Sequence, residues 1–175
     1  MRPLLVLLML LIPTVVAAQP AEPEGYRQSD YRAPTPATLK GARVISTEEA
    51  EALWRNRQAI FIDVLPQPPR PENLPEDTIW RGRQRDNIPD SIWLPNTGFG
   101  ELAPATEAYL KEGLQNASGG DLQKPLVIYC DRGCWMSWNA AKRALSYGYG
   151  NILWYPEGTE GWSEAGLPLE SAEPE

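Results

Sequence analysis

The chain has 175 residues, a formal net charge of −7 and no histidine. This length accommodates one domain with a hydrophobic core and is too short for two ordinary domains. The acidic balance argues against a nucleic-acid partner and against binding to anionic membrane surfaces. Without histidine, serine–histidine and cysteine–histidine dyads are excluded, and the commonest zinc ligand is missing. We expect the partner to be a small molecule or another protein.

The N-terminus has the pattern of a secretory signal peptide. Arg2 precedes an apolar run over residues 4–12, and Ala17 and Ala18 supply small residues at a cleavage site. The run is about half as long as a membrane-spanning helix, which disfavours the alternative of an uncleaved anchor. We therefore predict that residues 1–18 are removed and that the mature protein is periplasmic, without membrane association.

Proline-rich sequence separates this segment from the expected folded unit. Residues 19–40 carry four prolines among polar residues, which is typical of an extended segment outside the hydrophobic core. We expect this lead-in to precede a single domain at residues 41–169, with an acidic tail at residues 170–175.

The domain is predicted to begin with a short strand at residues 42–45. A capping-box pattern starts at Ser46 and predicts a helix over residues 47–57. The apolar run at residues 59–65 is typical of a parallel strand buried on both faces, and Asp63 falls at its carboxyl end. A carboxylate at a buried strand end needs donors, so Asp63 is interpreted as structural support.

A long segment at residues 66–91 contains six prolines and has neither helical nor strand periodicity. A loop of this length inside a compact domain is usually functional. Arg81, Arg83 and Arg85 lie in it. We interpret them as a solvated surface run, with the mouth of a pocket as the alternative.

The second half of the domain alternates short apolar runs with helical patterns. One of these strands ends directly in Cys130, and Gly148 terminates the helix that follows. Such alternation predicts an α/β fold with a mostly parallel sheet and helices on both faces, in which ligand sites lie at the carboxyl ends of strands. The predicted elements are strands at 92–94, 126–129 and 151–155 and helices at 106–114 and 136–147.

The loop that begins at Cys130 is suited to hold an anionic sulfur. Its backbone amides can point toward the Cys130 side chain, assisted by the N-terminus of the next helix. Together with Arg132 they would lower the thiol pKa without a histidine, and they would hold a persulfide equally well. The candidate loop residues are Cys130, Asp131, Arg132, Gly133, Cys134 and Trp135.

Several landmark segments stand in order along the chain: Ile62-Asp63-Val64, Asn87-Ile88-Pro89-Asp90-Ser91, Val127-Ile128-Tyr129-Cys130 with Gly133, Gly148-Tyr149, and Gly158 with Trp162 and Pro168. In this order and spacing they resemble the rhodanese-like domain family over about residues 41–169. The resemblance implies a three-layer sandwich and a six-residue active loop with Cys130 as its nucleophile. It also implies a small anionic sulfur donor.

The segment at residues 134–144 is similar, more narrowly, to an exported rhodanese-like subgroup named for a CXXCW motif. That subgroup is associated with alcohol catabolism that depends on pyrroloquinoline quinone (PQQ), which implies a quinoprotein dehydrogenase or a cytochrome c as partner. Trp135 and Glu157 depart from the pattern of the wider family and argue against thiosulfate as the physiological donor.

The two cysteines allow more than one interpretation. Cys130 could be an inert buried thiol, although its place at a strand end favours reactivity. Cys134 could form a static disulfide with Cys130, or it could be a resolving thiol that attacks a modified Cys130. Two thiolates without histidine leave a zinc site incomplete, so we expect neither metal nor cofactor. Trp135 and Trp138 could shield the sulfur or face a partner protein.

Three functions remain open at this point. The leading hypothesis is a periplasmic sulfurtransferase in which Cys130 accepts and passes on sulfane sulfur as a persulfide. The second is a thiol–disulfide redox protein that uses Cys130 and Cys134. The third is a non-catalytic module whose aromatic rim and proline-rich loop bind a dehydrogenase or an electron carrier.

Overall fold

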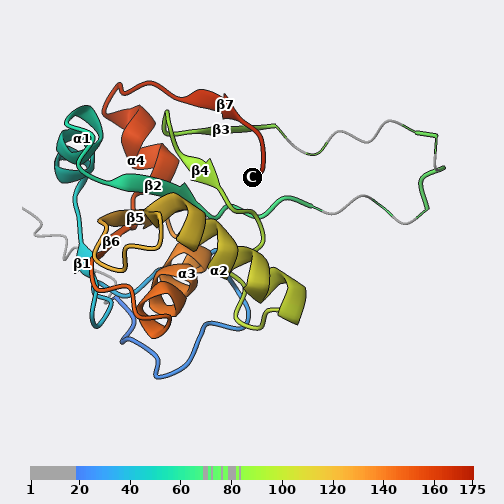
Figure 1. Ribbon diagram of the computed structural model, residues 1–175, viewed down its shortest axis with the longest axis horizontal. Helices are drawn as coiled ribbons and strands as arrows, with labels where there is room; N and C mark the ends of the chain where they lie inside the picture. The colour runs from blue at the N-terminus through green and yellow to red at the C-terminus, as the bar shows by residue number, and fades with distance from the viewer. Residues whose placement is uncertain (1–18, 69–70, 72, 76, 79–81, 83) are drawn as a thin grey trace, which may run out of the picture.

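A five-stranded parallel sheet forms the centre of the computed structural model, with strand order β1-β6-β5-β2-β4 (Figure 1). The structure describes residues 19–68, 71, 73–75, 77–78, 82 and 84–175. The predicted mostly parallel α/β fold is confirmed. The strands of this sheet are β1 (Arg43–Val44), β2 (Ile60–Asp63), β4 (Ile92–Trp93), β5 (Leu126–Tyr129) and β6 (Ile152–Tyr155).

Helices cover both faces of the sheet and give it three layers. Alternate residues of each strand point to opposite faces, and they divide the core into two clusters. Side chains of α2 (Pro104–Ser118) and α3 (Trp135–Ser146) pack in one cluster, whereas those of α1 (Thr47–Arg55) and α4 (Gly158–Glu164) pack in the other. The central strands β2, β5 and β6 are therefore buried on both sides, which explains their continuous apolar runs in the sequence.

Local sequence signals fix the ends of two helices. At the start of α1, the Ser46 side chain accepts a hydrogen bond from the Glu49 amide, and the Glu49 carboxylate accepts one from the Ser46 amide. This is the predicted capping box. After α3 the chain turns at Gly148, whose φ of 96° lies in the left-handed region that glycine adopts without steric cost.

The register of the central strands brings Asp63 next to the cysteine loop. Asp63 is paired with Tyr129, and the Val64 amide donates a 3.1 Å hydrogen bond to the Tyr129 carbonyl. Cys130 directly follows Tyr129 in the sequence. Both side chains therefore lie at the carboxyl edge of the sheet.

Two segments that were predicted to be irregular contain strands. Arg85–Asn87 (β3) lies within the predicted loop at 66–91, and it pairs antiparallel with Glu170–Ala172 (β7) from the predicted acidic tail. The tail is therefore ordered against the domain. The Glu175 amide donates a 3.0 Å hydrogen bond to the Trp93 carbonyl. The short helix α4 was also missed, because two glycines and polar residues hide its pattern.

The lead-in at residues 19–40 is extended, but it packs on the domain instead of lying outside the core. Leu39 is 2% exposed within the larger core cluster. The Asn139 side chain on α3 receives a 2.9 Å hydrogen bond from the Arg27 amide and donates another to the Arg27 carbonyl. In Figure 1 this blue segment passes beside α3. The prediction of a lead-in separate from the core was therefore wrong.

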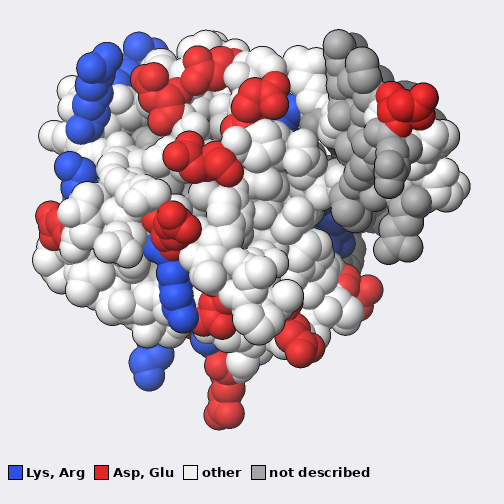
Figure 2. Space-filling view, turned by 45° about the vertical axis from the view of Figure 1, so that its right-hand side comes forward, with Lys and Arg blue, Asp and Glu red and all other residues white. Residues whose placement is uncertain are grey.

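The predicted signal peptide at residues 1–18 lies outside the described residues, as do Arg81 and Arg83. Among the residues that are described, no helix combines the length and apolar character of a membrane span. Acidic side chains are scattered over the face shown in Figure 2, and basic ones lie mainly toward its left side. This distribution agrees with the net charge of −7.

Candidate active site

The two cysteines form a buried pair at the carboxyl end of β5. Cys130 follows the last residue of that strand, and Cys134 precedes the first residue of α3. Both are free thiols, with Cys130 0% and Cys134 3% exposed. Their side chains are joined by a hydrogen bond. The structure thus brings together the two residues that the sequence proposed as nucleophile and resolving thiol.

The surroundings of this pair favour ionisation of the opposite sulfur from the one predicted. Burial raises the pKa of the Cys130 thiol well above its ordinary value, and the hydrogen bond to Cys134 and the carboxylates of Asp63 and Asp131 raise it further. The hydrogen bond from Cys130 lowers the pKa of Cys134 against the effect of burial, with help from the Met136 amide. The more readily ionised thiol is therefore Cys134.

Protein groups already occupy two of the loop amides that were expected to surround a sulfur anion. The Arg132 amide donates to the Glu160 carboxylate at 2.8 Å. The Trp135 amide donates to the Tyr31 carbonyl at 2.9 Å. These two amides of the predicted cradle are therefore not available to Cys130 in this conformation.

The Arg132 side chain is bound to glutamates and not to a cysteine sulfur in this conformation. Its guanidinium binds Glu157 at 2.5 Å and Glu164 at 2.6 Å on the outer side of α4. These two carboxylates raise the pKa of Arg132, because they stabilise its charged form. The expectation that Arg132 stabilises charge at Cys130 is contradicted by this placement.

Arg85 and two aspartates form an ion-pair cluster beside the cysteines. The Arg85 Nε atom lies 2.6 Å from Asp63, and its Nη1 atom lies 2.7 Å from Asp131. The side chain of Asp63 is 0% exposed and that of Arg85 is 8% exposed. Burial would lower the pKa of Arg85, but the two carboxylates outweigh it and raise the pKa. Arg85 is thus a buried structural cation, which corrects its interpretation as a solvated or pocket-mouth residue.

Asp131 connects this cluster to the lead-in. One of its oxygens accepts from Arg85 and from the Thr159 hydroxyl, and the other accepts from the guanidinium of Arg32. Burial opposes ionisation of Asp131, but Arg85 and Arg32 prevail and lower its pKa. Asp131 is therefore held as an anion between two arginines, directly after Cys130.

A close approach at Gly158 fixes the other side of the loop. The Thr159 amide at the start of α4 donates a 3.1 Å hydrogen bond to the Cys130 carbonyl. A Cβ atom at residue 158 would collide with that carbonyl, and φ at Gly158 is +54°. Only glycine therefore lets α4 approach the cysteine loop this closely.

Trp135 and Trp138 pack against each other with ring centroids 5.4 Å apart, and the lead-in covers both. Their indole nitrogens donate to the carbonyls of Pro34 and Thr38, each at 3.1 Å. Neither ring forms an open aromatic rim. Both contribute to the cover over the loop.

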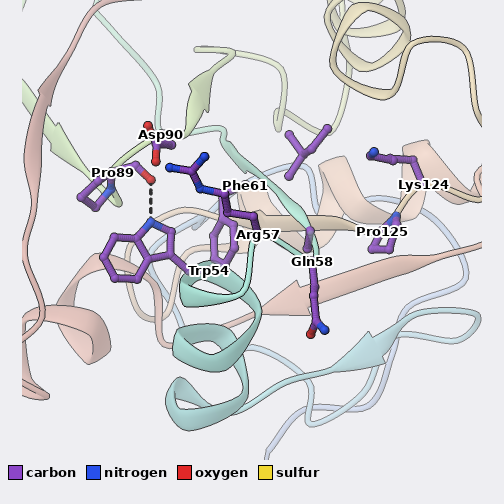
Figure 3. A pocket seen from close by; sticks show the side chains of 10 residues that line it. Trp54, Arg57, Gln58, Phe61, Pro89, Asp90, Lys124 and Pro125 are labelled. Carbon is purple, nitrogen blue, oxygen red and sulfur yellow. Dashed lines mark hydrogen bonds between the residues drawn. The ribbon is translucent and has the colours of Figure 1, made fainter.

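A concave site without cysteines lies at the amino end of the sheet (Figure 3). It encloses about 390 Å³ between Trp54, Phe61 and the segment at residues 124–125. The Trp54 indole donates a 3.0 Å hydrogen bond to the Pro89 carbonyl, and the Arg57 side chain extends above the indole. This pocket has no cysteine in its lining. Among the described residues, no group of three or more metal-ligating side chains is placed to hold a metal ion.

Family comparison agrees with this architecture. The model of the rhodanese-like domain matches residues 46–165, so the chain belongs to the rhodanese-like domain family. No match is found among curated proteins.

Solved structures with this fold are distant in sequence. The thiosulfate sulfurtransferase from Pseudomonas aeruginosa is 21% identical with a TM-score of 0.52, and the match covers 76% of this chain and 21% of that one. The polysulfide-sulfur transferase homodimer from Wolinella succinogenes is 21% identical with a TM-score of 0.47, covering 74% and 79%. A human single-domain sulfurtransferase is 22% identical with a TM-score of 0.43, covering 70% and 96%.

Sequence reasoning missed two groups at the site, Arg32 and Glu160. Arg32 lies 99 residues before its partner Asp131, and Glu160 lies 28 residues after Arg132. No local spacing connects such pairs. The proline-rich composition around Arg32 pointed away from the site instead of toward it.

Proposed function

We propose that the protein is a sulfurtransferase in which Cys130 accepts sulfane sulfur from a small anionic donor and carries it as a persulfide. The observation that carries this proposal is the hydrogen-bonded pair of free thiols at the carboxyl end of β5. Membership of the rhodanese-like family and the name of the Pseudomonas aeruginosa relative support it. This is also the leading function inferred from the sequence.

The pair can activate a nucleophile without histidine. Cys134 ionises first, so its thiolate can take the proton from Cys130 through their hydrogen bond. The Cys130 thiolate then attacks the sulfane sulfur of the donor. A bond forms between the two sulfurs while the sulfur–sulfur bond of the donor breaks, and the leaving group departs with the electron pair.

The persulfide can then be discharged in two ways. An external thiolate can attack the outer sulfur, which releases Cys130 as a thiolate. Alternatively, the sulfur of Cys134 attacks the sulfur of Cys130, which gives an internal disulfide and hydrosulfide that carries away the Cys134 proton. The second route needs an external dithiol to reduce the disulfide before another cycle.

A thiol–disulfide redox protein is the second candidate, and one observation favours it. The pKa of Cys134 is lowered by its contact with Cys130, a property of attacking thiols in disulfide exchange. In this function the two cysteines alternate between dithiol and disulfide and exchange electrons with a partner protein.

The deciding experiment measures the intact mass of the reduced mature protein after exposure to thiosulfate and, separately, to polysulfide. We expect a gain of one sulfur atom that dithiothreitol removes and that is lost in Cys130→Ala. In Cys134→Ser the gain should form more slowly, because the base is missing, but it should persist, because no internal disulfide can displace the sulfur. The Cys134→Ser variant cannot form the internal disulfide, so its failure to gain sulfur from either donor, while the wild-type protein becomes two hydrogens lighter, would instead favour the redox function.

The proposal also includes a cellular location and a protein partner. The predicted signal peptide supports a periplasmic protein, and the similarity of residues 134–144 to the CXXCW subgroup supports a role beside PQQ-dependent alcohol catabolism. A quinoprotein dehydrogenase or a cytochrome c is then the expected protein partner. Fractionation of cells and crosslinking of the Cys134→Ser variant in the periplasmic fraction would test both statements.

A further inference from the structure

Residues 27–38 of the lead-in, here called the N-terminal strap, lie directly over the cysteine loop. The Trp135 amide donates to the Tyr31 carbonyl at 2.9 Å, and the Ala33 amide donates to the Gly133 carbonyl at 3.2 Å. These bonds place Arg32 opposite Cys134 in an antiparallel bridge. The strap is therefore aligned with the loop residue by residue, and it explains why both thiols are covered.

Three arginines surround the loop, and their partners differ. Arg132 is held by two glutamates away from the sulfurs. Arg85 is held by two aspartates and is buried. Arg32 is 57% exposed, and within the described chain its one carboxylate partner is Asp131. Arg32 is thus the most exposed of the three, whereas Arg85, whose Nη2 atom also lacks a hydrogen-bond partner, is buried and held by its two aspartates.

We propose that Arg32 is the charge partner of the sulfur anion in the cysteine pair, so that the N-terminal strap forms part of the active site. Its guanidinium is anchored on Asp131, the residue after Cys130, while its backbone is paired with Cys134. An arginine in this place can interact with a thiolate and, once sulfur has been transferred, with an anionic persulfide or donor. The persulfide part rests on the proposed function, whereas the thiolate part does not.

The charges around the pair support this assignment. Asp63 and Asp131 face Cys130 and oppose formation of an anion there. Asp131 also opposes an anion at Cys134, whereas Arg32 favours it. The interaction is mutual, because both cysteines contribute to raising the pKa of Arg32. Arg32 therefore supplies from a distant segment the positive charge that the sequence assigned to Arg132.

The test compares two substitutions within the strap. Arg32→Gln removes the charge that faces the pair. Arg27→Gln makes the same charge change at a side chain that lies over the Trp135 ring and bonds to the Ser29 carbonyl. The alkylation rate of each cysteine by iodoacetamide is followed from pH 5 to pH 10 by peptide mass. The midpoint of the profile reports ionisation, and the plateau at high pH reports access.

We expect Arg32→Gln to move the Cys134 midpoint upward by about one pH unit, which corresponds to about a tenfold slower reaction at neutral pH. Arg32→Lys should restore most of the shift, and Arg27→Gln should leave the midpoint in place. A loosened strap without an electrostatic role would raise the plateau and leave the midpoint unchanged, which would overturn the proposal.

This experiment needs no sulfur donor, so its outcome is separate from that of the proposed function. If the wild-type protein gains no sulfur but Arg32→Gln shifts the midpoint, the sulfurtransferase proposal fails and the role of Arg32 stands. If sulfur is gained and the midpoint is the same in Arg32→Gln and wild type, the reverse holds. Circular dichroism of each variant confirms that the fold is retained.

Discussion

The two ends of the parallel sheet differ in how far they are covered and in how their charged side chains are paired. At the carboxyl end, the cysteine pair is covered by the N-terminal strap, and its charged neighbours are bound to one another. At the amino end, a pocket of about 390 Å³ is open, and neither Arg57 nor Lys124 forms an ion pair within the described part of the chain. The pocket at the amino end therefore lacks the reactive groups. At the carboxyl end a hollow of about 360 Å³ lies beside Arg132 and Gly133 of the cysteine loop, but neither cysteine lines it.

This difference shows that concavity alone is a poor guide to chemistry in this fold. Reactive sulfur requires a defined electrostatic environment, which burial and fixed ion pairs provide. An open pocket with solvated cations provides little control over a pKa, because water screens their charge. Mutations at the two ends should consequently differ in the size of their effects and in the property that they change.

The largest effect is expected at the buried ion pair of the carboxyl end. Arg85→Met leaves the Asp63 carboxylate buried without its main partner, and the free energy of unfolding should fall by about 3–5 kcal/mol. Chemical denaturation measures this loss. Lys124→Met, an exposed cation of the amino end, is the matched control and should change stability far less. Equal losses in the two variants would contradict the comparison.

A smaller loss of stability is expected where the lead-in attaches to α3. Asn139→Ala removes the side chain that bonds to both backbone groups of Arg27 and to the Gly98 carbonyl. The free energy of unfolding should fall by about 1–3 kcal/mol, because a buried carbonyl and amide lose their partners. Limited proteolysis should then cut within residues 19–38 faster than in wild type. An unchanged cleavage rate would show that other contacts hold the lead-in.

The pH dependence of thiol modification should separate the two cysteines. The pKa of Cys134 is lowered and that of Cys130 is raised, so alkylation of Cys134 should begin at lower pH. At pH 8 we expect Cys134 to react at least about tenfold faster, since one pKa unit changes the thiolate fraction by about that factor. Peptide mass spectrometry gives both rates in one sample, and faster labelling of Cys130 would reverse the assignment of charge within the pair.

The smallest effect is expected at the amino end. Arg57 has a φ of 51°, in the left-handed region that glycine favours. Arg57→Gly removes a backbone strain of about 1 kcal/mol, and the greater freedom of glycine in the unfolded chain offsets part of that gain. We expect the stability to rise slightly and the sulfur uptake of Cys130 to stay unchanged. A loss of sulfur uptake would connect the two ends of the sheet.

The sequence predicted the central layers of the fold because they depend on local patterns. The strand that ends at Cys130 and the helix after it are confirmed within one residue, since apolar runs and a terminating glycine mark them directly. The strands β3 and β7 were missed because each has three residues, polar side chains and a partner more than 80 residues away. Their pairing is a tertiary event that leaves no local period.

The position of the site could be predicted from the sequence, but the charges that face the sulfurs could not. Cys130, Cys134 and Asp63 were identified from their places at strand and helix ends, and the structure brings them together. Arg132 was assigned to the sulfur because it is close in sequence, but Glu157 and Glu164 hold it elsewhere. Which charge faces a sulfur depends on side-chain direction and on distant segments, and neither can be deduced from spacing.

The attachment of the strap also has a consequence for how the protein folds. The hydrogen bonds that Asn139, Trp135 and Trp138 donate to the lead-in connect residues that are 112, 101 and 100 positions apart in the chain. Contacts of such separation form late, because the cost of closing a long loop must first be met by other structure. During synthesis, the segment that covers the thiols emerges long before the loop that it covers. We therefore expect the newly made domain to pass through a stage with exposed cysteines before the strap closes over them.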